Sequence, residues 1–183
     1  MTPAGADAAG ADAAGAGAPD PLAAKIIGLL TARGETVAAA ESLTGGLVTA
    51  ALTSVPGSSA AVLGGIVSYA TSLKAELLGV PAELLAAQGP VDPEVAAAMA
   101  EGVRGRLGAS YGLATTGVAG PGPADGKPAG TVFVAVAGPA ARGGGGRARV
   151  SGLELPGGRA AVRAATVQAV LTLLVTELRE DIS

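Results

Sequence analysis

The sequence AESLTGG at residues 40–46 constrains the fold of this chain more than any other stretch. A short apolar run at residues 36–40 precedes it, and an apolar run with helical periodicity begins at Leu47. This order predicts a buried strand, a tight glycine turn and then a helix. The first N–H groups of a helix lack internal partners and lie at the positive end of its dipole, so such a turn suits a phosphate, a carboxylate or a developing oxyanion.

The rest of the chain predicts helices that first alternate with strands, followed by three consecutive strands. Asp20 and Asp92, each followed by proline, are expected to cap helices, and Thr71 or Ser72 is expected to cap a third. This pattern predicts a mixed α/β layered domain and not a purely doubly wound sheet. Helices are expected at residues 20–34, 47–55, 71–79, 81–88, 92–107 and 158–178, and strands at residues 36–40, 62–70, 111–116, 130–137 and 147–155.

Residues 1–19 form an Ala/Gly/Pro/Asp tract without a periodic apolar face. We expect a disordered tail here, with an interaction arm as the alternative, ahead of one folded domain at residues 20–183. The tract has no basic start and no apolar core, so no signal peptide is expected. The uncharged stretch 42–73 is interrupted at Pro56, and neither half reaches the ~20 apolar residues of a membrane helix. We therefore expect a cytoplasmic protein that does not enter a membrane.

The composition narrows the chemistry that is open to this chain. Its 183 residues include no His and no Cys, which excludes Ser-His-Asp triads, thiolate nucleophiles and metal sites built on either residue. Acid–base chemistry near neutral pH therefore falls to a Lys, Tyr, Asp or Glu with a shifted pKa. A net charge of −3 and an aromatic content of 2% give no support to nucleic-acid binding.

Ser42 is the first candidate for chemistry. With Thr44, Gly45 and Gly46 it combines a hydroxyl nucleophile with backbone N–H groups that glycine leaves accessible to a substrate. The alternative interpretation is that Ser and Thr only cap the following helix.

Lys74 and Tyr69 together are the second candidate for a catalytic role. Lys74 is the first charged residue after Glu41, and packing of the intervening uncharged stretch around it would lower its pKa toward that of a base. The alternative is an ordinary exposed helix Lys. Ser42 and Lys74 do not form an S-x-x-K motif, so only the fold can bring them together.

Two further candidates lie in the second half of the chain. Thr116 and Gly117 end a predicted strand, where ligands often bind in α/β sheets, although a long turn is the alternative. Arg159 and Arg163 begin the last helix and have the chemistry of phosphate ligands, with a solvated helix face as the alternative.

Several segments share their residues, order and spacing with one protein family. They are AESLTGG (40–46), VPGSSA (55–60), VSY (67–69) with Lys74 and LGV (78–80), TGVAGP (116–121) and KPAGTV (127–132). Together they resemble the CinA C-terminal domain family, the nicotinamide-nucleotide amidohydrolases. The resemblance covers about residues 21–178.

This resemblance implies a three-layer α/β/α domain that associates as a dimer or larger homo-oligomer. It implies hydrolysis of the carboxamide of nicotinamide mononucleotide to nicotinate mononucleotide and ammonia, without a metal or another cofactor. The family's Ser nucleophile falls on Ser42, its Lys base on Lys74 and its neighbouring Tyr on Tyr69. Its hydroxyl residue falls on Thr116, and its Arg, a candidate for holding the substrate phosphate, falls on Arg159.

The chain departs from the family pattern at a few positions. Leu43 replaces a frequent Cys, Ala70 and Thr71 replace a Ser-Asn pair, and Gly158 stands where Asp is common. The mechanism that we expect has Lys74 accept the Ser42 proton and the N–H groups around Gly45 and Gly46 hold the oxyanion. Two alternatives stay open: a non-catalytic nucleotide- or phosphate-binding module, and an amidohydrolase for another small carboxamide.

Overall fold

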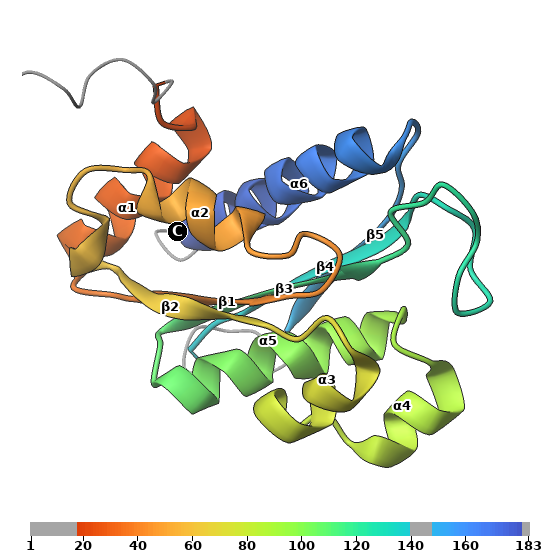
Figure 1. Cartoon of the computed structure of the whole chain (residues 1–183). Helices are drawn as coiled ribbons and strands as arrows, with labels where there is room; N and C mark the ends of the chain where they lie inside the picture. The colour runs from red at the N-terminus through yellow and green to blue at the C-terminus, as the bar shows by residue number, and fades with distance from the viewer. Residues whose placement is uncertain (1–17, 140–147, 181–183) are drawn as a thin grey trace, which may run out of the picture.

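The computed structural model describes residues 18–139 and 148–180, which form a five-stranded sheet with helices on both faces (Figure 1). Every predicted helix and strand is present in this part of the chain, within a few residues of its expected bounds. Residues 1–17 of the predicted tail lie outside the described residues. The elements are α1 (Pro21–Arg33), β1 (Val37–Glu41), α2 (Leu47–Thr53), the short 3-10 helix η1 (Ser58–Ala60), β2 (Val62–Val67), α3 (Thr71–Leu78), α4 (Ala82–Gln88), α5 (Pro93–Leu107), β3 (Tyr111–Gly117), β4 (Thr131–Ala137), β5 (Arg149–Glu154) and α6 (Arg159–Glu180).

The sheet has the strand order β2-β1-β3-β4-β5 and mixes both pairing directions. β1 pairs in parallel with β2 and β3, while β4 runs antiparallel to β3 and β5 antiparallel to β4. The predicted mixed α/β sheet is therefore confirmed. The three parallel strands end at the same edge of the sheet, where residues that follow them come together.

The two faces of the sheet carry side chains of different size. Helices α1, α2 and α6 cover one face, and α3, α4 and α5 cover the other, which gives the predicted three layers (Figure 1). Val37 of β1 and Leu113 of β3 belong to the first core, whereas Ala38 and Ala114 belong to the second. Side chains alternate along each strand, so this pattern places larger residues under α6 and alanines under α5.

The alanine-rich face lets α5 approach the sheet closely. A Cβ atom built on Gly112 of β3 would lie 2.0 Å from the carbonyl oxygen of Ala100 in α5, closer than any real contact. Glycine is therefore required at position 112 because α5 packs closely on the sheet, and not because the chain turns there. Such packing explains how a chain with 2% aromatic residues fills its core.

Two of the predicted helix caps are confirmed and one prediction is wrong. Asp20 and Asp92 each accept a 2.8 Å hydrogen bond from the backbone N–H two residues further on. Ala70 occupies the N-cap position of α3, and no side chain caps this helix, so neither Thr71 nor Ser72 has the expected role. Thr71 is instead the first helical residue, which moves the cap position one residue earlier.

Helix α6 is apolar because it is a core helix. Among the helices of the described residues it alone is long and apolar enough to cross a membrane by length and composition. Its Val162, Val170 and Leu174 are fully buried in the core between the sheet and α1.

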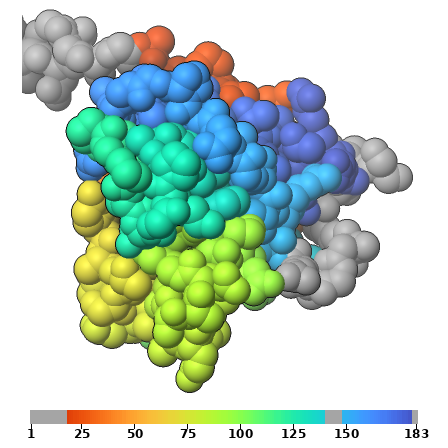
Figure 2. Space-filling view, turned by 90° about the vertical axis from the view of Figure 1, so that its right-hand side faces the viewer, coloured from red at the N-terminus to blue at the C-terminus, as the bar shows by residue number. Residues whose placement is uncertain are grey.

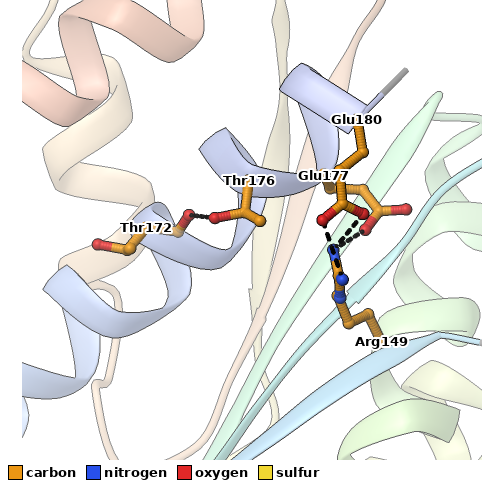
Figure 3. Close-up of polar contacts among 5 residues, drawn as sticks. All are labelled: Arg149, Thr172, Thr176, Glu177 and Glu180. Carbon is orange, nitrogen blue, oxygen red and sulfur yellow. Dashed lines mark hydrogen bonds and ion pairs between the residues drawn. The ribbon is translucent and has the colours of Figure 1, made fainter. Parts of the chain in front are cut away.

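The far end of α6 is tied to the edge strand β5 by an ion-pair cluster (Figure 3). Arg149 lies 2.7 Å from a carboxylate oxygen of Glu180 and 3.2 Å from one of Glu177. The hydrogen bond and negative charge of Glu180, with those of Glu177, raise the pKa of the Arg149 guanidinium. Thr176 on the same helix turns its hydroxyl back onto the carbonyl oxygen of Thr172. This exposed cluster lies on β5 and the last turn of α6, and the site described below uses the first turn of α6.

Candidate active site

Ser42 and Lys74, 32 residues apart in the sequence, meet at the edge where the parallel strands end. Ser42 follows β1 directly, and Lys74 lies on the inner face of α3. The Lys74 Nζ atom lies 3.2 Å from Ser42 Oγ, 2.8 Å from the carbonyl oxygen of Ser68 and 3.4 Å from that of Tyr69. Lys74 is 1% exposed and Ser42 is 8% exposed. The fold therefore places a buried amine beside a buried hydroxyl.

Burial changes the acid–base properties of Lys74. Desolvation of the charged amine lowers the pKa of Lys74 to about 8, while the negative charge of Asp125 acts in the opposite direction. A pKa near 8 leaves a useful fraction of the amine neutral close to neutral pH. Lys74 is therefore not the exposed helix Lys of the alternative interpretation.

The carboxylate of Glu41 closes the N-terminus of α2. Glu41 is fully buried, and its Oε2 atom accepts hydrogen bonds from the backbone N–H groups of Gly46 at 2.8 Å and Val48 at 3.0 Å. Its Oε1 atom accepts from the backbone N–H and the hydroxyl of Thr49 at 2.8 and 2.7 Å. Four donors offset the cost of burying this charge. No role was predicted for Glu41; an acidic residue that ends a buried strand, four residues before Gly45, is the sequence signal that could have revealed this cap.

This cap corrects the expected role of the two turn glycines. The N–H of Gly46 donates to Glu41, and the N–H of Gly45 donates to the carbonyl oxygen of Ser42 at 3.1 Å, so neither is free to hold an oxyanion. Thr44, Gly45 and Gly46 also lie outside the set of residues that line the adjacent cavity. Gly45 and Gly46 are required for their backbone conformation, with φ angles of 60° and 102°.

The turn still offers two backbone donors beside Ser42. Within the described residues, the N–H groups of Leu43 and Thr44 donate no hydrogen bond. Leu43 is buried in the core under α6 and also lines the cavity. The hydroxyl of Thr44 is fully buried and pairs with that of Thr115 at 2.7 Å. Of these two residues Leu43 lines the cavity and Thr44 does not, so the N–H group of Leu43 is the unpaired donor beside that space.

Arg163 fixes the orientation of the Leu43–Thr44 and Thr44–Gly45 peptide groups. Its Nε atom donates to the carbonyl oxygen of Leu43 at 3.0 Å, and its Nη2 atom donates to that of Thr44 at 2.8 Å. In a trans peptide the C=O of one residue and the N–H of the next point in opposite directions. Arg163 therefore turns the Thr44 N–H away from α6, and it is a ligand of the turn and not a free phosphate ligand.

A cavity of about 190 Å³ opens beside the Ser42–Lys74 pair. On the face shown in Figure 2, the loop of residues 118–130 lies between the first turn of α6 and helices α3 and α4. The hydroxyl of Thr116 is held by the carbonyl oxygen of Pro90 at 2.6 Å. The predicted site residues that line this cavity are Ser42, Lys74, Tyr69, Thr116, Gly117 and Arg159.

Tyr69 and Arg159 form the outer part of the cavity. Tyr69 is 58% exposed, and its hydroxyl accepts a hydrogen bond from Arg159 Nη2 at 3.1 Å. Arg159 Nη1 lies 3.5 Å from the carbonyl oxygen of Gly120. The carbonyl oxygen of Tyr69, and not its hydroxyl, is the group that reaches Lys74. The structure thus brings Tyr69 and Arg159 together at the mouth, at a distance from the buried amine.

The acidic side chains do not gather into a metal site in the part of the chain that the structure describes. No group of three or more of them is placed to hold a metal ion. Asp125, which the sequence interpretation missed, is the one acidic residue among those described that line the cavity.

Comparisons with known proteins agree on one family. The family model of the CinA C-terminal domain matches residues 19–178. A CinA-like protein of Frankia casuarinae is 53% identical over 158 residues, which cover 86% of this chain and 35% of that protein. A CinA-like protein of Anaeromyxobacter species strain K is 54% identical over 121 residues, covering 66% of this chain and 30% of that protein. The chain therefore spans about a third of the length of these curated relatives.

Solved structures give the same assignment. The competence/damage inducible protein CihA of Agrobacterium tumefaciens has a TM-score of 0.79 at 38% identity, over 86% of this chain and 93% of that one. A competence-damaged protein (CinA) superfamily protein of Enterobacter cloacae has a TM-score of 0.79 at 32% identity, over 86% of this chain and 90% of that one. The α/β fold and the family resemblance of the sequence motifs are thereby confirmed, and the chain belongs to the CinA C-terminal domain family.

Proposed function

We propose that this protein is an amidohydrolase that converts nicotinamide mononucleotide to nicotinate mononucleotide and ammonia. The observation that carries the proposal is the 3.2 Å contact between the buried amine of Lys74 and the hydroxyl of Ser42 at the inner end of the cavity. A hydroxyl beside a base whose pKa is lowered is the arrangement that acyl transfer requires. Membership of the family supports the same chemistry.

The first half of the reaction forms an acyl-enzyme. The neutral amine of Lys74 accepts the proton of the Ser42 hydroxyl while Ser42 Oγ attacks the carboxamide carbon. The carbonyl oxygen becomes an oxyanion, which the unpaired N–H group of Leu43, a residue that lines the cavity beside Ser42, stabilises. The Lys74 ammonium then gives its proton to the amide nitrogen, the C–N bond breaks and ammonia leaves.

The second half releases the product. Water attacks the acyl carbon and gives a proton to the Lys74 amine, and the C–O bond to Ser42 breaks as the Ser42 oxygen takes this proton back. The product is a carboxylic acid that ionises near neutral pH. A single Lys acts as base and acid in turn, which meets the constraint that the chain contains no His.

The size of the cavity suggests how a mononucleotide would bind. At about 190 Å³ the cavity is smaller than the roughly 300 Å³ at which pockets for whole drug-sized ligands begin. We place the ring and its carboxamide inside, and the ribose and phosphate outside, along Tyr69 and Arg159. The Arg159 guanidinium, which is exposed at the mouth, would hold the phosphate.

The same small volume favours a second candidate, an amidohydrolase for a smaller carboxamide that fits inside the cavity. A panel of carboxamides with and without the ribose phosphate separates the two candidates.

A cytoplasmic location and a homo-oligomeric state, like the absence of nucleic-acid and membrane partners, remain predictions.

The proposal is tested by incubating the purified protein with nicotinamide mononucleotide and detecting nicotinate mononucleotide by mass spectrometry, with and without a chelator. We expect product in both cases. Tight binding without turnover would instead identify a nucleotide-binding module. Faster turnover of a small carboxamide without the phosphate would favour the second candidate.

A further inference from the structure

Asp125 lies in the loop that connects β3 to β4 and lines the same cavity as Ser42, Lys74 and Arg159. This loop lies on the face of the molecule shown in Figure 2. Asp125 is exposed, and its carboxylate makes no hydrogen bond or ion pair with any other described residue. An acidic residue without a partner among the described residues thus lines a cavity whose other two charged residues, Lys74 and Arg159, are basic.

The local backbone conformation favours Asp at position 125, but it does not require a charged side chain there. Ala124 and Lys127 exchange two backbone hydrogen bonds, of 3.1 and 2.9 Å, around Asp125 and Gly126. The two central residues have φ angles of 51° and 71°, the type I′ turn that Asn-Gly and Asp-Gly favour. Asn would suit this turn equally well, so the turn does not require the carboxylate charge.

The charge of Asp125 opposes the proposed chemistry when the cavity is empty. A negative group near Lys74 favours the protonated amine, whereas the mechanism needs the neutral one. A positive charge on the bound ligand, between the carboxylate and the amine, removes this conflict, because it would pair with Asp125 and disfavour protonation of Lys74.

We propose that Asp125 is a specificity-determining residue that selects carboxamides on a cationic aromatic ring over neutral ones. This inference rests on the proposed function and names the feature of the substrate that the site recognises. In nicotinamide mononucleotide the ring is a pyridinium cation that bears the carboxamide, and the phosphate is an anion. Asp125 would take the cationic ring, while Arg159 takes the phosphate.

The experiment uses two ligands that differ in the charge of the ring and share the same phosphate. Nicotinamide mononucleotide carries a pyridinium ring, and its reduced form carries a neutral dihydropyridine ring. Their dissociation constants are measured by calorimetry on the full chain with Ser42→Ala, which blocks turnover, with and without Asp125→Asn. The matched control is Glu83→Gln, which removes an equal charge from an exposed residue that does not line the cavity.

We expect Asp125→Asn to weaken binding of the oxidised ligand by about fivefold, the upper range for an exposed ion pair, and to leave the reduced ligand unchanged. Glu83→Gln should change neither, and the thermal midpoint of Asp125→Asn should stay at the parental value. Equal effects of Asp125→Asn on both ligands, or no effect on either, would overturn the role of Asp125 while leaving the proposed function intact. If neither ligand binds the Ser42→Ala chain, the proposed substrate is wrong and the inference fails with it.

Discussion

The amine of Lys74 lies 2.8 Å from the carbonyl oxygen of Ser68, closer than its 3.2 Å separation from the hydroxyl of Ser42. The carbonyl oxygen of Tyr69 is a second acceptor at 3.4 Å. A neutral amine has two N–H groups, which can donate hydrogen bonds to these two carbonyl oxygens. Its one lone pair is then free to accept the proton of the Ser42 hydroxyl. The backbone at the end of β2 thus orients Lys74 as a proton acceptor toward Ser42.

The first prediction concerns pH. Burial lowers the pKa of Lys74 to about 8, and the neutral amine is the active form, so kcat/KM should rise with pH and level off above this value. Rates measured from about pH 6 to about pH 10 should show one titration with a midpoint near 8. Lys74→Arg, whose guanidinium stays protonated, should abolish activity at every pH. A flat profile, or an active Lys74→Arg variant, would remove Lys74 as the base.

The second prediction is that Lys74→Met stabilises the protein while it destroys activity. A pKa lowered from 10.5 to about 8 corresponds to about 3 kcal/mol of unfavourable folding free energy. This cost is fully present below pH 8, where Lys74 is protonated in both the folded and the unfolded state. It disappears as the pH rises past 10.5, where Lys74 is neutral in both. Met leaves the Ser68 carbonyl without its donor, so we expect a net gain of about 1–2 kcal/mol at pH 7.

Urea denaturation at about pH 7 and at about pH 10 tests this second prediction. The gain should shrink at the higher pH, because the wild-type amine is then largely neutral in the folded state. A Lys74→Met variant that is less stable than wild type at both pH values would show that the amine is not under desolvation strain.

The third prediction concerns the buried cap of α2. Glu41→Gln replaces an acceptor oxygen with an NH2 group that faces N–H donors, so it should cost about 2–4 kcal/mol of stability. It should also lower kcat, since Ser42 is the next residue. The matched control is Asp92→Asn at the cap of α5, where Asn caps as well as Asp and the change should stay within about 0.5 kcal/mol. Equal losses of stability in the two variants would show that the carboxylate of Glu41 is no more important to stability than that of Asp92.

The fourth prediction separates the two Arg residues of α6. Arg163→Lys cannot hold both the Leu43 and Thr44 carbonyl groups, so kcat for nicotinamide mononucleotide should fall about tenfold with little change in KM. Arg159→Lys should instead raise KM for the mononucleotide but not for nicotinamide riboside, which lacks the phosphate. Steady-state kinetics on the two substrates check both expectations, and the reverse pattern would exchange the two roles.

Much of the fold could be predicted because the apolar periodicities are clear and the helix ends are marked. Asp20 and Asp92, each before proline, locate the starts of α1 and α5 correctly. The cap of α3 was missed because its N-cap position is held by Ala70, whose side chain gives no signal. Spacing alone could not show that Ser42 and Lys74 meet, since their contact depends on the parallel pairing of β1 with β2 and on the packing of α3.

Sequence reasoning missed the roles of Glu41 and Asp125, because both roles depend on contacts that arise only in the folded chain. Glu41 reaches the N–H groups of α2 because the turn folds the helix back over the strand end, and this takes away the donors expected at Gly46. Asp125 belongs to an Asp-Gly turn, which in sequence predicts only a hairpin. Its position over the cavity follows from the crossing of the β3–β4 loop past the ends of β1 and β2.

The most direct test of the Ser42–Lys74 mechanism is the rate of ammonia release from nicotinamide mononucleotide by wild type, Ser42→Ala and Ser68→Ala. Ser68→Ala is the matched control, because it removes the hydroxyl of another buried serine. This hydroxyl has no hydrogen-bond partner among the described residues. We predict release by wild type and Ser68→Ala, and a loss of at least about a thousandfold in Ser42→Ala. Ammonia release by Ser42→Ala at the wild-type rate would contradict the account.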